Sequence, residues 1–241
     1  RHKQTGEVNQ AFAEPKKYTL PDGQIALSCH ESLLNDQEAM NYITGARGIS
    51  IEAVKHFKIG LKIGKDGGRW LSIPHYAGGR LVNVKYRSLP PAKKTFRRIE
   101  GCKSILFNVD VLEGNEEVYL CEGELDAVTL WDQGIKNVVA TTTGAGGLDP
   151  EWIDQLSKAF KIYLCYDPDE AGRAGAREAA RRLGYDRCFN LVLPEGQDVN
   201  DLFKDGTGHG EFNQAVQDAR KFDVAGIMSF QQGIEVFSRE R

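Results

Sequence analysis

Four apolar segments that alternate with helix-type sequence constrain the fold of this chain most strongly. They read EVYLCEG, NVVATTT, KIYLCYD and RCFNLVL, and all four are short and continuous. The stretches between them are about 10–14 residues long and have the periodicity of helices. Continuous apolar strands that alternate with helices predict a parallel sheet with both faces covered. We therefore expect an α/β fold for the second half of the chain.

Glycine, aspartate and proline residues mark where the helices of this half begin and end. Gly134 and Gly184 follow two of the helical stretches, which is typical of a helix C-terminus. Asp149 and Pro150 open the stretch DPEWIDQLSKAF, with aspartate as the N-cap and proline at the first helical position. These signals fix the order of strands and helices along the chain.

The first half of the chain has a different pattern. Residues 1–22 are polar and without periodicity, so we expect a linker there, and residues 24–58 look helical with a break at 45–48. Ser50 is a candidate N-cap for a short helix that ends near Phe57. The segments WLSIPHY and RLVNVKYRS alternate in polarity and flank Ala-Gly-Gly, which predicts a β-hairpin.

These patterns divide the chain into expected regions. The boundaries that we predict are a linker at 1–22, a smaller α+β subdomain with the hairpin at 23–112, the parallel-sheet domain at 113–206 and a helical extension at 207–241. The extension has Ile227, Phe230, Ile234 and Phe237 on one side of an expected helix.

Carboxylates follow three of the four apolar strands. Glu122 follows the first, Asp167 and Asp169 follow the third, and Asp198 follows the fourth, together with Asn200 and Asp201, whereas the second strand ends in the glycine loop 144–147. In an open parallel sheet, ligands bind at the carboxyl ends of the strands. Carboxylates that gather there repel one another unless a cation neutralises them, and oxygen ligands without His or Cys suit Mg²⁺ or Mn²⁺.

Each of these motifs also has a simpler interpretation. A single DxD before a helix is commonly a turn and a cap, EGELD alone is commonly a solvated corner, and the glycine loop is no Walker A motif because no Gly-Lys-Ser/Thr follows. The five histidines are scattered without ligand spacing, so we assign none to a site, and we expect Trp70, Trp131 and Trp152 in the core.

The net charge of −3 conceals a strongly basic stretch between residues 85 and 103. Glu100 is its only acidic residue, against seven basic ones: Lys85, Arg87, Lys93, Lys94, Arg97, Arg98 and Lys103. Such a stretch fits phosphate binding.

Tyr86 and Phe96 lie within this basic stretch, and each could either stack on bases or pack in the core. For each of them we expect packing in the core. Arg173 and Arg177 have two equal interpretations, as phosphate ligands or as partners of Glu170 and Glu178.

Cysteine usage and hydropathy constrain the compartment in which we expect the chain. The five cysteines include no CxxC pair, which argues against a zinc ribbon and a disulfide framework and favours a reducing compartment. Cys121 and Cys165 lie in apolar runs and are expected to be buried. The sequence has no apolar run of about 20 residues that would cross a membrane.

The motifs together support a resemblance to a known family. EGELDA, then YDPDEAGRAGA about forty residues later, then GQDVND resemble the TOPRIM domain that bacterial-type primases share with topoisomerases and related nucleases. Together with YITGARGIS, GGRLVNVKYRS and KKTFRRIEG, the order of motifs is similar to the primase half of T7-type primase-helicases, the DnaG-related group that includes Twinkle. The resemblance covers roughly residues 30–210.

The resemblance implies roles residue by residue. As catalytic residues it implies Glu122, Asp126, Asp167 and Asp169. As metal ligands it implies Glu122, Asp167, Asp169 and Asp198. For nucleic acid or nucleotide we expect Lys85, Arg87, Lys94, Arg97, Arg98 and Arg173. Asn200 stands where many primases have another aspartate, which implies a weaker second metal site.

The resemblance also implies a function. We expect a DNA primase core that makes short RNA primers on single-stranded DNA from ribonucleoside triphosphates by Mg²⁺- or Mn²⁺-dependent nucleotidyl transfer. A zinc-binding module and a helicase domain are expected in the same longer polypeptide. Two alternatives stay open: a catalytically weak DNA-binding module of a replicative helicase, and a TOPRIM nuclease. The expected location is cytoplasmic, in a bacterial or phage-infected cell, or mitochondrial if the chain is Twinkle-like.

Overall fold

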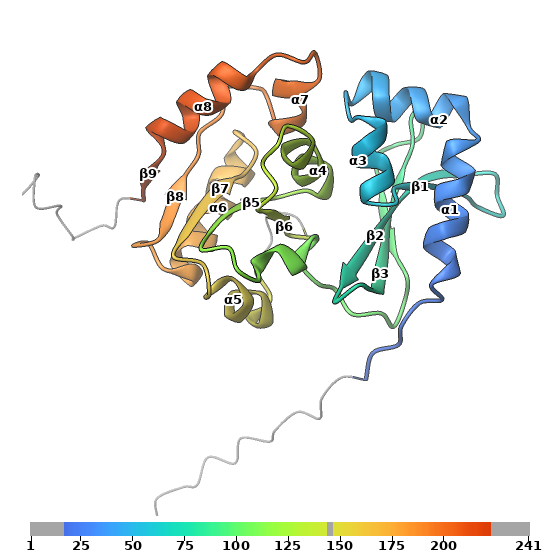
Figure 1. Cartoon of the computed structure of the whole chain (residues 1–241), viewed down its shortest axis with the longest axis horizontal. Coiled ribbons are helices and arrows are strands. Elements are labelled where there is room, and N and C mark those ends of the chain that lie inside the picture. Colours follow the sequence, from blue (N-terminus) through green and yellow to red (C-terminus); the bar gives the residue numbers. More distant parts are fainter. Residues whose placement is uncertain (1–16, 144–146, 223–241) are drawn as a thin grey trace, which may run out of the picture.

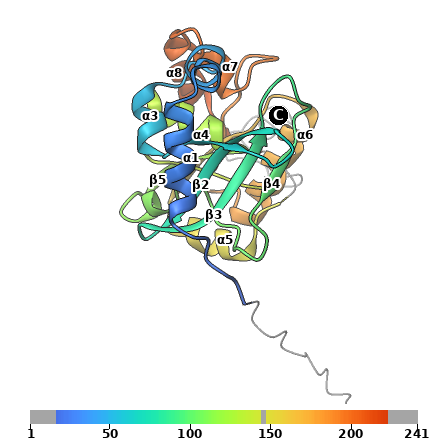
Figure 2. The same ribbon diagram turned by 90° about the vertical axis from the view of Figure 1, so that its right-hand side faces the viewer.

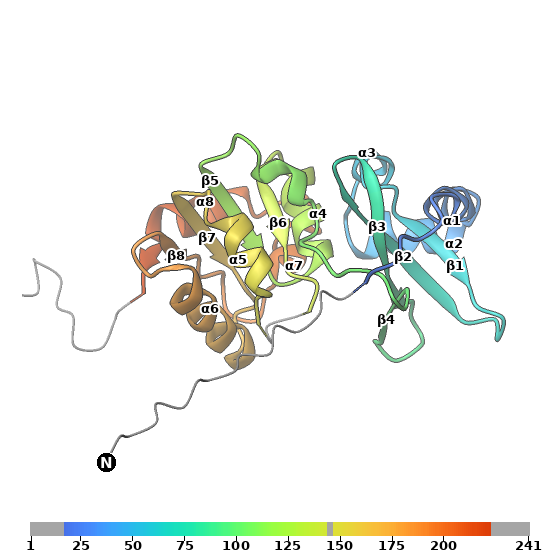
Figure 3. The same ribbon diagram turned by 90° about the horizontal axis from the view of Figure 1, so that it is seen from below.

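The computed structural model describes residues 17–143 and 147–222, and within them it contains two separate sheets. The two sheets lie side by side along the long axis of the molecule (Figures 1 and 3). The expected linker before residue 17, most of the glycine loop at 144–147 and the expected helix after residue 222 lie outside the described residues. No helix in the described part is both long and apolar enough to cross a bilayer.

The first sheet is antiparallel and contains the predicted hairpin. Its strands run in the order β1 (Gly60–Ile63), β2 (Arg69–Ala77), β3 (Arg80–Ser88) and β4 (Phe96–Arg98). The turn between β2 and β3 is made by Gly78 and Gly79, whose φ angles of 56° and 72° suit the tight turn of a twisted hairpin. The hairpin prediction is confirmed, whereas the short strands β1 and β4 were not predicted.

Helices cover one side of this sheet. They are α1 (Gln24–Leu34), α2 (Gln37–Asn41), the π-helical turn η1 (Tyr42–Ala46) and α3 (Ile51–His56). Figure 2 shows α1 lying across the strands. The prediction of Ser50 as an N-cap is confirmed, because its hydroxyl accepts a hydrogen bond of 3.1 Å from the Ala53 N–H.

The second sheet is the predicted parallel one. Strands β5 (Glu117–Cys121), β6 (Val138–Ala140), β7 (Lys161–Cys165) and β8 (Cys188–Asn190) are parallel, and β9 (Arg220–Lys221) adds an antiparallel edge. The order is β6-β5-β7-β8-β9, and the short turn η2 (Val109–Leu112) precedes the sheet.

Helices cover both faces of the parallel sheet, as predicted. Trp152 of α5 (Pro150–Leu156) and Ala179 of α6 (Glu170–Leu183) pack in the core on one face. The other face packs against α4 (Glu124–Asp132), α7 (Val199–Phe203) and α8 (His209–Asp218). Helix α8 lies within the helical extension expected at 207–241. Helix α7 was not predicted, because it is only five residues long and follows a Pro/Gly-rich turn that is typical of a loop.

One apolar core connects the two sheets. It includes Ile43 and Phe57 from the first layer of helices and Val128 of α4, together with Cys121 and Cys165 of the parallel sheet. The expected burial of both cysteines is therefore confirmed. Trp152 is 2% exposed as expected, but Trp70 and Trp131 are only partly buried. Trp131 is only partly buried because it lies at the seam between the two sheets, where its ring stacks on that of His56 with the ring centroids 4.1 Å apart.

Candidate active site

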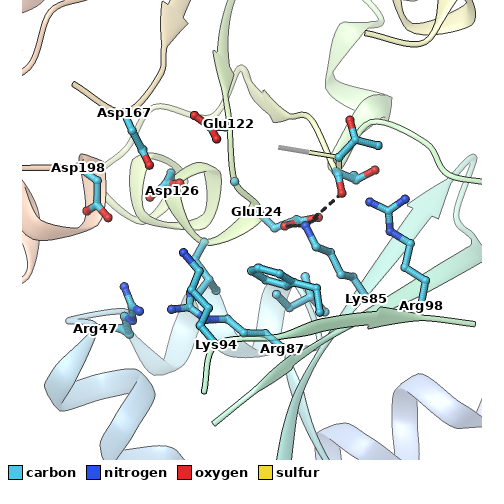
Figure 4. A pocket seen from close by; sticks show the side chains of 16 residues that line it. Arg47, Lys85, Arg87, Lys94, Arg98, Glu122, Glu124, Asp126, Asp167 and Asp198 are labelled. Atoms are coloured by element: carbon cyan, nitrogen blue, oxygen red, sulfur yellow. Dashed lines mark hydrogen bonds and ion pairs between the residues drawn. The ribbon is translucent and has the colours of Figure 1, made fainter. Parts of the chain in front are cut away.

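A pocket of about 440 Å³ opens where the carboxyl ends of the parallel strands meet the first sheet (Figure 4). One wall carries acidic side chains and the other carries cationic ones. The acidic wall consists of Glu122, Asp126, Asp167 and Asp198. The cationic side chains that line the pocket are Arg47, Lys85, Arg87, Lys94 and Arg98.

Backbone topology places the acidic wall. Glu122 directly follows β5, and Asp167 follows β7 by two residues, so that two neighbouring parallel strands deliver both side chains to one edge. Asp126 lies in the first turn of α4, and Asp198 is the N-cap of α7, where its carboxylate accepts from the Asp201 N–H at 2.6 Å. The structure therefore brings together four of the five acidic residues that the sequence singled out.

The fifth, Asp169, is placed differently. Its carboxylate caps α6 by accepting from the Gly172 N–H at 2.7 Å, and its side chain is outside the pocket lining. Position 172 requires glycine, because a Cβ would lie 2.1 Å from the carbonyl oxygen of Asp167. The Arg173 guanidinium donates to the Pro168 carbonyl within the same turn. The DPDEAGR sequence thus folds into a closed turn that presents Asp167 to the pocket.

Arg173 and Arg177 pair with neither of the two glutamates considered from the sequence. Glu178 binds Arg181 instead, and the Arg177 guanidinium lies 6.0 Å from the ring centroid of Phe222.

Clustering of the carboxylates raises pKa values in the acidic wall. Burial, followed by the charges of Asp198 and Asp167, raises the pKa of Asp126 to about 8. Burial and the charges of Asp198 and Asp169 also raise the pKa of Asp167. Such shifts mean that the ionised cluster is unfavourable by itself, and a nearby cation would relieve it.

A further carboxylate that lines the pocket, Glu124, has the opposite environment. Glu124 is 3% exposed, and the Lys85 ammonium donates to both of its oxygens at 2.9 and 2.7 Å and to the Thr142 carbonyl at 3.1 Å. His75 Nε2 lies 3.5 Å from Glu124 Oε1. Burial opposes ionisation, but the His75 contact and the Lys85 charge outweigh it and lower the pKa of Glu124 to about 2.

Sequence reasoning missed this network. We assigned no histidine to a site and gave Glu124 no role, and the structure commits Lys85 to an ion pair in addition to lining the pocket. No local signal distinguishes Glu124 from Glu122 in EGELD, because the partner comes from a strand 39 residues earlier.

The basic stretch divides between pocket and surface. Lys94 and Arg87 line the pocket, and burial followed by the charge of Arg47 lowers the pKa of Arg87. Arg98 also lines it and donates to the Ser104 hydroxyl at 2.6 Å. Arg97 lies outside, stacked over Trp70 at 4.3 Å. Arg47, from the motif YITGARGIS, is a pocket residue that was not predicted.

The two aromatic residues of the stretch have different outcomes. Tyr86 is 5% exposed, as expected for a core residue. Phe96 is 47% exposed and lines the pocket, so the expectation of a core residue is wrong for it. The reason is its position on the edge strand β4, where its ring lies under the ammonium groups of Lys85 and Lys94, at 4.7 and 5.8 Å.

The acidic wall fits a hard divalent cation in its chemistry. Its donors are carboxylate oxygens, and the raised pKa values of Asp126 and Asp167 mark charge that a cation would neutralise. Across residues 17–143 and 147–222, no three Asp, Glu, His or Cys side chains are already arranged as a metal site.

Comparison with known proteins identifies relatives of this arrangement. Residues 119–203 match the Toprim-like family. The chain is 30% identical over 183 residues to the Twinkle homolog protein, chloroplastic/mitochondrial, of Arabidopsis thaliana, covering 66% of this chain and 25% of that protein. It is 32% identical over 160 residues to the DNA helicase/primase of Enterobacteria phage T3, covering 62% and 27%.

Solved structures show the same fold. The Aquifex aeolicus primase, with zinc-binding and RNA polymerase domains, superposes with a TM-score of 0.73 at 23% identity over 90% of this chain and 64% of that chain. The primase fragment of the bacteriophage T7 primase-helicase superposes with a TM-score of 0.58 at 26% identity over 71% and 72%. The chain spans only about a quarter of the Twinkle homolog.

Proposed function

Because this chain contains a Toprim domain and is homologous to Twinkle-type and T7-type primase-helicases, we propose that it is the RNA-polymerizing core of a DNA primase. Its reaction is the synthesis of short RNA primers on single-stranded DNA from ribonucleoside triphosphates. Each step forms a bond between a 3′-hydroxyl oxygen and an α-phosphorus, and pyrophosphate leaves.

One observation carries this proposal: the two walls of the pocket have opposite charge. A metal-bound nucleoside triphosphate is itself polar in this sense, with cations on one side and phosphate oxygens on the other. The acidic wall of Glu122, Asp126, Asp167 and Asp198 suits the cations, and the opposite wall suits the phosphates. The volume of about 440 Å³ is in the range of small-molecule sites.

The proposed roles follow from these positions. Glu122, Asp167 and Asp198 would hold Mg²⁺ or Mn²⁺, with Asp169 as a further ligand through the oxygen that does not cap α6. When bound, the metal would activate the 3′-hydroxyl and neutralise charge on the leaving pyrophosphate. Asp126 holds a proton near neutral pH until a cation lowers its pKa.

The cationic side chains bind phosphate. Lys94, Arg87 and Arg98 bind the triphosphate from the wall opposite the carboxylates, and Lys85 supports this wall through Glu124. We propose that Arg97 and Arg173, which are on the surface, contact the phosphates of the DNA outside the pocket. Phe96 offers an exposed ring on which a base can stack.

The setting of the domain is part of the proposal. Because the relatives are longer, we propose that a zinc-binding module and a helicase domain belong to the same polypeptide. We propose residues 23–112 and 113–206 as the two units of this part of the chain, with 113–206 as the catalytic one. We propose a DNA-replicating compartment: the cytoplasm of a bacterial or phage-infected cell, or an organelle if the function is Twinkle-like.

Labelled single-stranded DNA tests the proposal against its alternatives. The chain, joined to a zinc-binding module, is incubated with Mn²⁺ with and without ribonucleoside triphosphates. A primase yields short RNA only with nucleotides. The Asp167→Ala and Asp169→Ala variants lose this product, by at least about 100-fold for Asp167→Ala, and still bind DNA. Cleavage of the DNA without nucleotides identifies a nuclease, and binding without any product identifies a DNA-holding module. Either result overturns the proposed function.

A further inference from the structure

We propose that Asn200 is a positioning residue that holds Arg47 in the pocket, rather than a weakened metal ligand. The inference rests on the proposed function, because it adds Arg47 to the cationic side chains that bind the triphosphate. Asn200 is 1% exposed and lies in α7, whereas Arg47 lies between η1 and α3. Figure 1 shows α7 and α3 on the two sides of the seam between the sheets. The Asn200 side chain is outside the pocket lining.

Both amide hydrogens and the amide oxygen of Asn200 are engaged in hydrogen bonds. Its amide Nδ2 donates to the Arg47 carbonyl at 2.7 Å and to the Thr129 hydroxyl at 3.0 Å, and its Oδ1 accepts from Arg47 Nη1 at 3.1 Å. The reversed amide would place oxygen against the carbonyl and nitrogen against the guanidinium, so only one orientation is compatible. An aspartate at this position would have no N–H for the Arg47 carbonyl, and two acceptors would face each other in a buried place.

Hydrogen bonds hold the Arg47 guanidinium on two of its edges. Nη1 is held by Asn200, and Nε donates to the Tyr42 hydroxyl at 3.0 Å. Within the described part of the chain, no hydrogen bond engages Nη2. Arg47 lines the pocket, and Figure 4 shows its guanidinium below Asp198. The charge of Arg47 acts on the pocket, because it opposes the rise in the pKa of Asp126 and contributes to the lowered pKa of Arg87.

The backbone after Arg47 confirms how close the two regions are. Gly48 has a φ of 63°, and a Cβ on it would lie 2.6 Å from the Lys204 carbonyl oxygen at the end of α7. A side chain at position 48 is therefore excluded by both conformation and contact. The Arg-Gly pair and Asn200 form one contact across the seam, with the arginine directed to the pocket and the glycine against α7.

The test is the affinity of the chain for a fluorescent ATP analogue in Mg²⁺, with the corresponding nucleoside as the phosphate-free probe. We expect Asn200→Asp to weaken triphosphate binding about 10-fold, as misplacement of a ligand-orienting group does, and to leave nucleoside binding unchanged. Arg47→Ala is expected to have at least the same effect. In the Arg47→Ala background, Asn200→Asp should add less than about 2-fold, because it acts through the arginine.

Tyr42→Phe is the second variant, since Tyr42 is only partly buried and removal of its hydroxyl leaves the fold intact. We expect several-fold weaker triphosphate binding from it. Arg69→Lys, at an arginine paired with Asp36 away from the pocket, is the control and should bind as the wild type does.

Two results would overturn the inference. One is wild-type triphosphate affinity in both Asn200→Asp and Tyr42→Phe. The other is a lower half-saturating Mg²⁺ concentration in Asn200→Asp, which would identify position 200 as a metal ligand. Absence of triphosphate binding by the wild type would instead contradict the proposed function, so the two failures are distinguishable.

Discussion

Glu124 and Asp126 are two residues apart in the same turn of α4, yet they have opposite electrostatic environments. Glu124 faces the first sheet and is neutralised by Lys85, with His75 beside it, so its pKa falls to about 2. Asp126 faces Asp167 and Asp198, and its pKa rises to about 8. The charge of Glu124 is therefore compensated by a neighbouring cation, whereas Asp126 lies against two further carboxylates.

This difference distinguishes a carboxylate with a structural role from carboxylates with a role in binding a ligand. A compensated buried carboxylate holds elements together, because its charge already has a partner. An uncompensated cluster is costly to the fold and is relieved by a ligand of opposite charge. The Lys85–Glu124 pair joins the first sheet to α4, whereas the Asp126 side is the place where a divalent cation is needed.

Loss of Lys85 should have the largest effect on stability. In Lys85→Ala, Glu124 stays buried without its ammonium partner, so we expect the free energy of unfolding to fall by about 3–5 kcal/mol. Urea denaturation measures the change. Lys103→Ala is the matched control, because the Lys103–Glu151 pair is largely exposed and is worth about 1 kcal/mol or less. Equal losses in the two variants would contradict the structural role of the buried pair.

Asp126→Asn should stabilise the metal-free chain, and only at high pH. Because the pKa of Asp126 is raised from its ordinary 3.8 to about 8, the folded state resists ionisation, and the stability that this carboxyl contributes is lost as the pH rises through that window. Asparagine cannot ionise. We expect a gain in the free energy of unfolding of about 1–2 kcal/mol at pH 8 and none at pH 4, measured by urea denaturation in a chelator.

The same experiment in Mg²⁺ supplies the control for Asp126. The cation should stabilise the wild type more than the variant at pH 8, which removes the advantage of asparagine. A gain that is equal at pH 4 and pH 8 would mean that packing, and not charge, sets the effect.

Phe96→Ala should have the smallest effect on the fold and act on binding instead. The ring is 47% exposed, so we expect the free energy of unfolding to change by less than about 0.5 kcal/mol. Loss of a stacking surface should weaken single-stranded DNA binding by about 1 kcal/mol, measured by fluorescence anisotropy. Phe160→Ala, at a ring that is 73% exposed and outside the pocket, should bind as the wild type does. Identical DNA affinities in the two variants would exclude Phe96 from the interface.

The parallel sheet and the edge where its acidic residues gather could be predicted from the sequence, because both depend on local patterns. Strand periodicity and the N-cap residues Ser50 and Asp149 are properties of a few neighbouring residues, and the structure agrees with them. The strand ends then bring Glu122 and Asp167 together by topology alone.

The pairing between the two halves could not be predicted in this way. Lys85 and Glu124, or Arg47 and Asn200, meet only after both sheets have formed, and nothing local in either segment identifies its partner. The same limit explains Phe96 and Asp169. Whether an aromatic residue in a basic strand is buried, and whether an aspartate caps a helix or faces a pocket, depends on which element lies opposite.

The most direct test of the contrast between Glu124 and Asp126 is calorimetric titration of Mn²⁺ into the chain at pH 7.5, in two buffers with different ionisation enthalpies. Carboxyls with raised pKa values must lose protons when a cation binds. We predict Mn²⁺ binding with net proton release in the wild type, and loss of both in Asp167→Asn. Mn²⁺ binding without proton release, or with equal affinity in Asp167→Asn, would contradict the assignment of Asp126, Asp167 and Asp198 to the metal site.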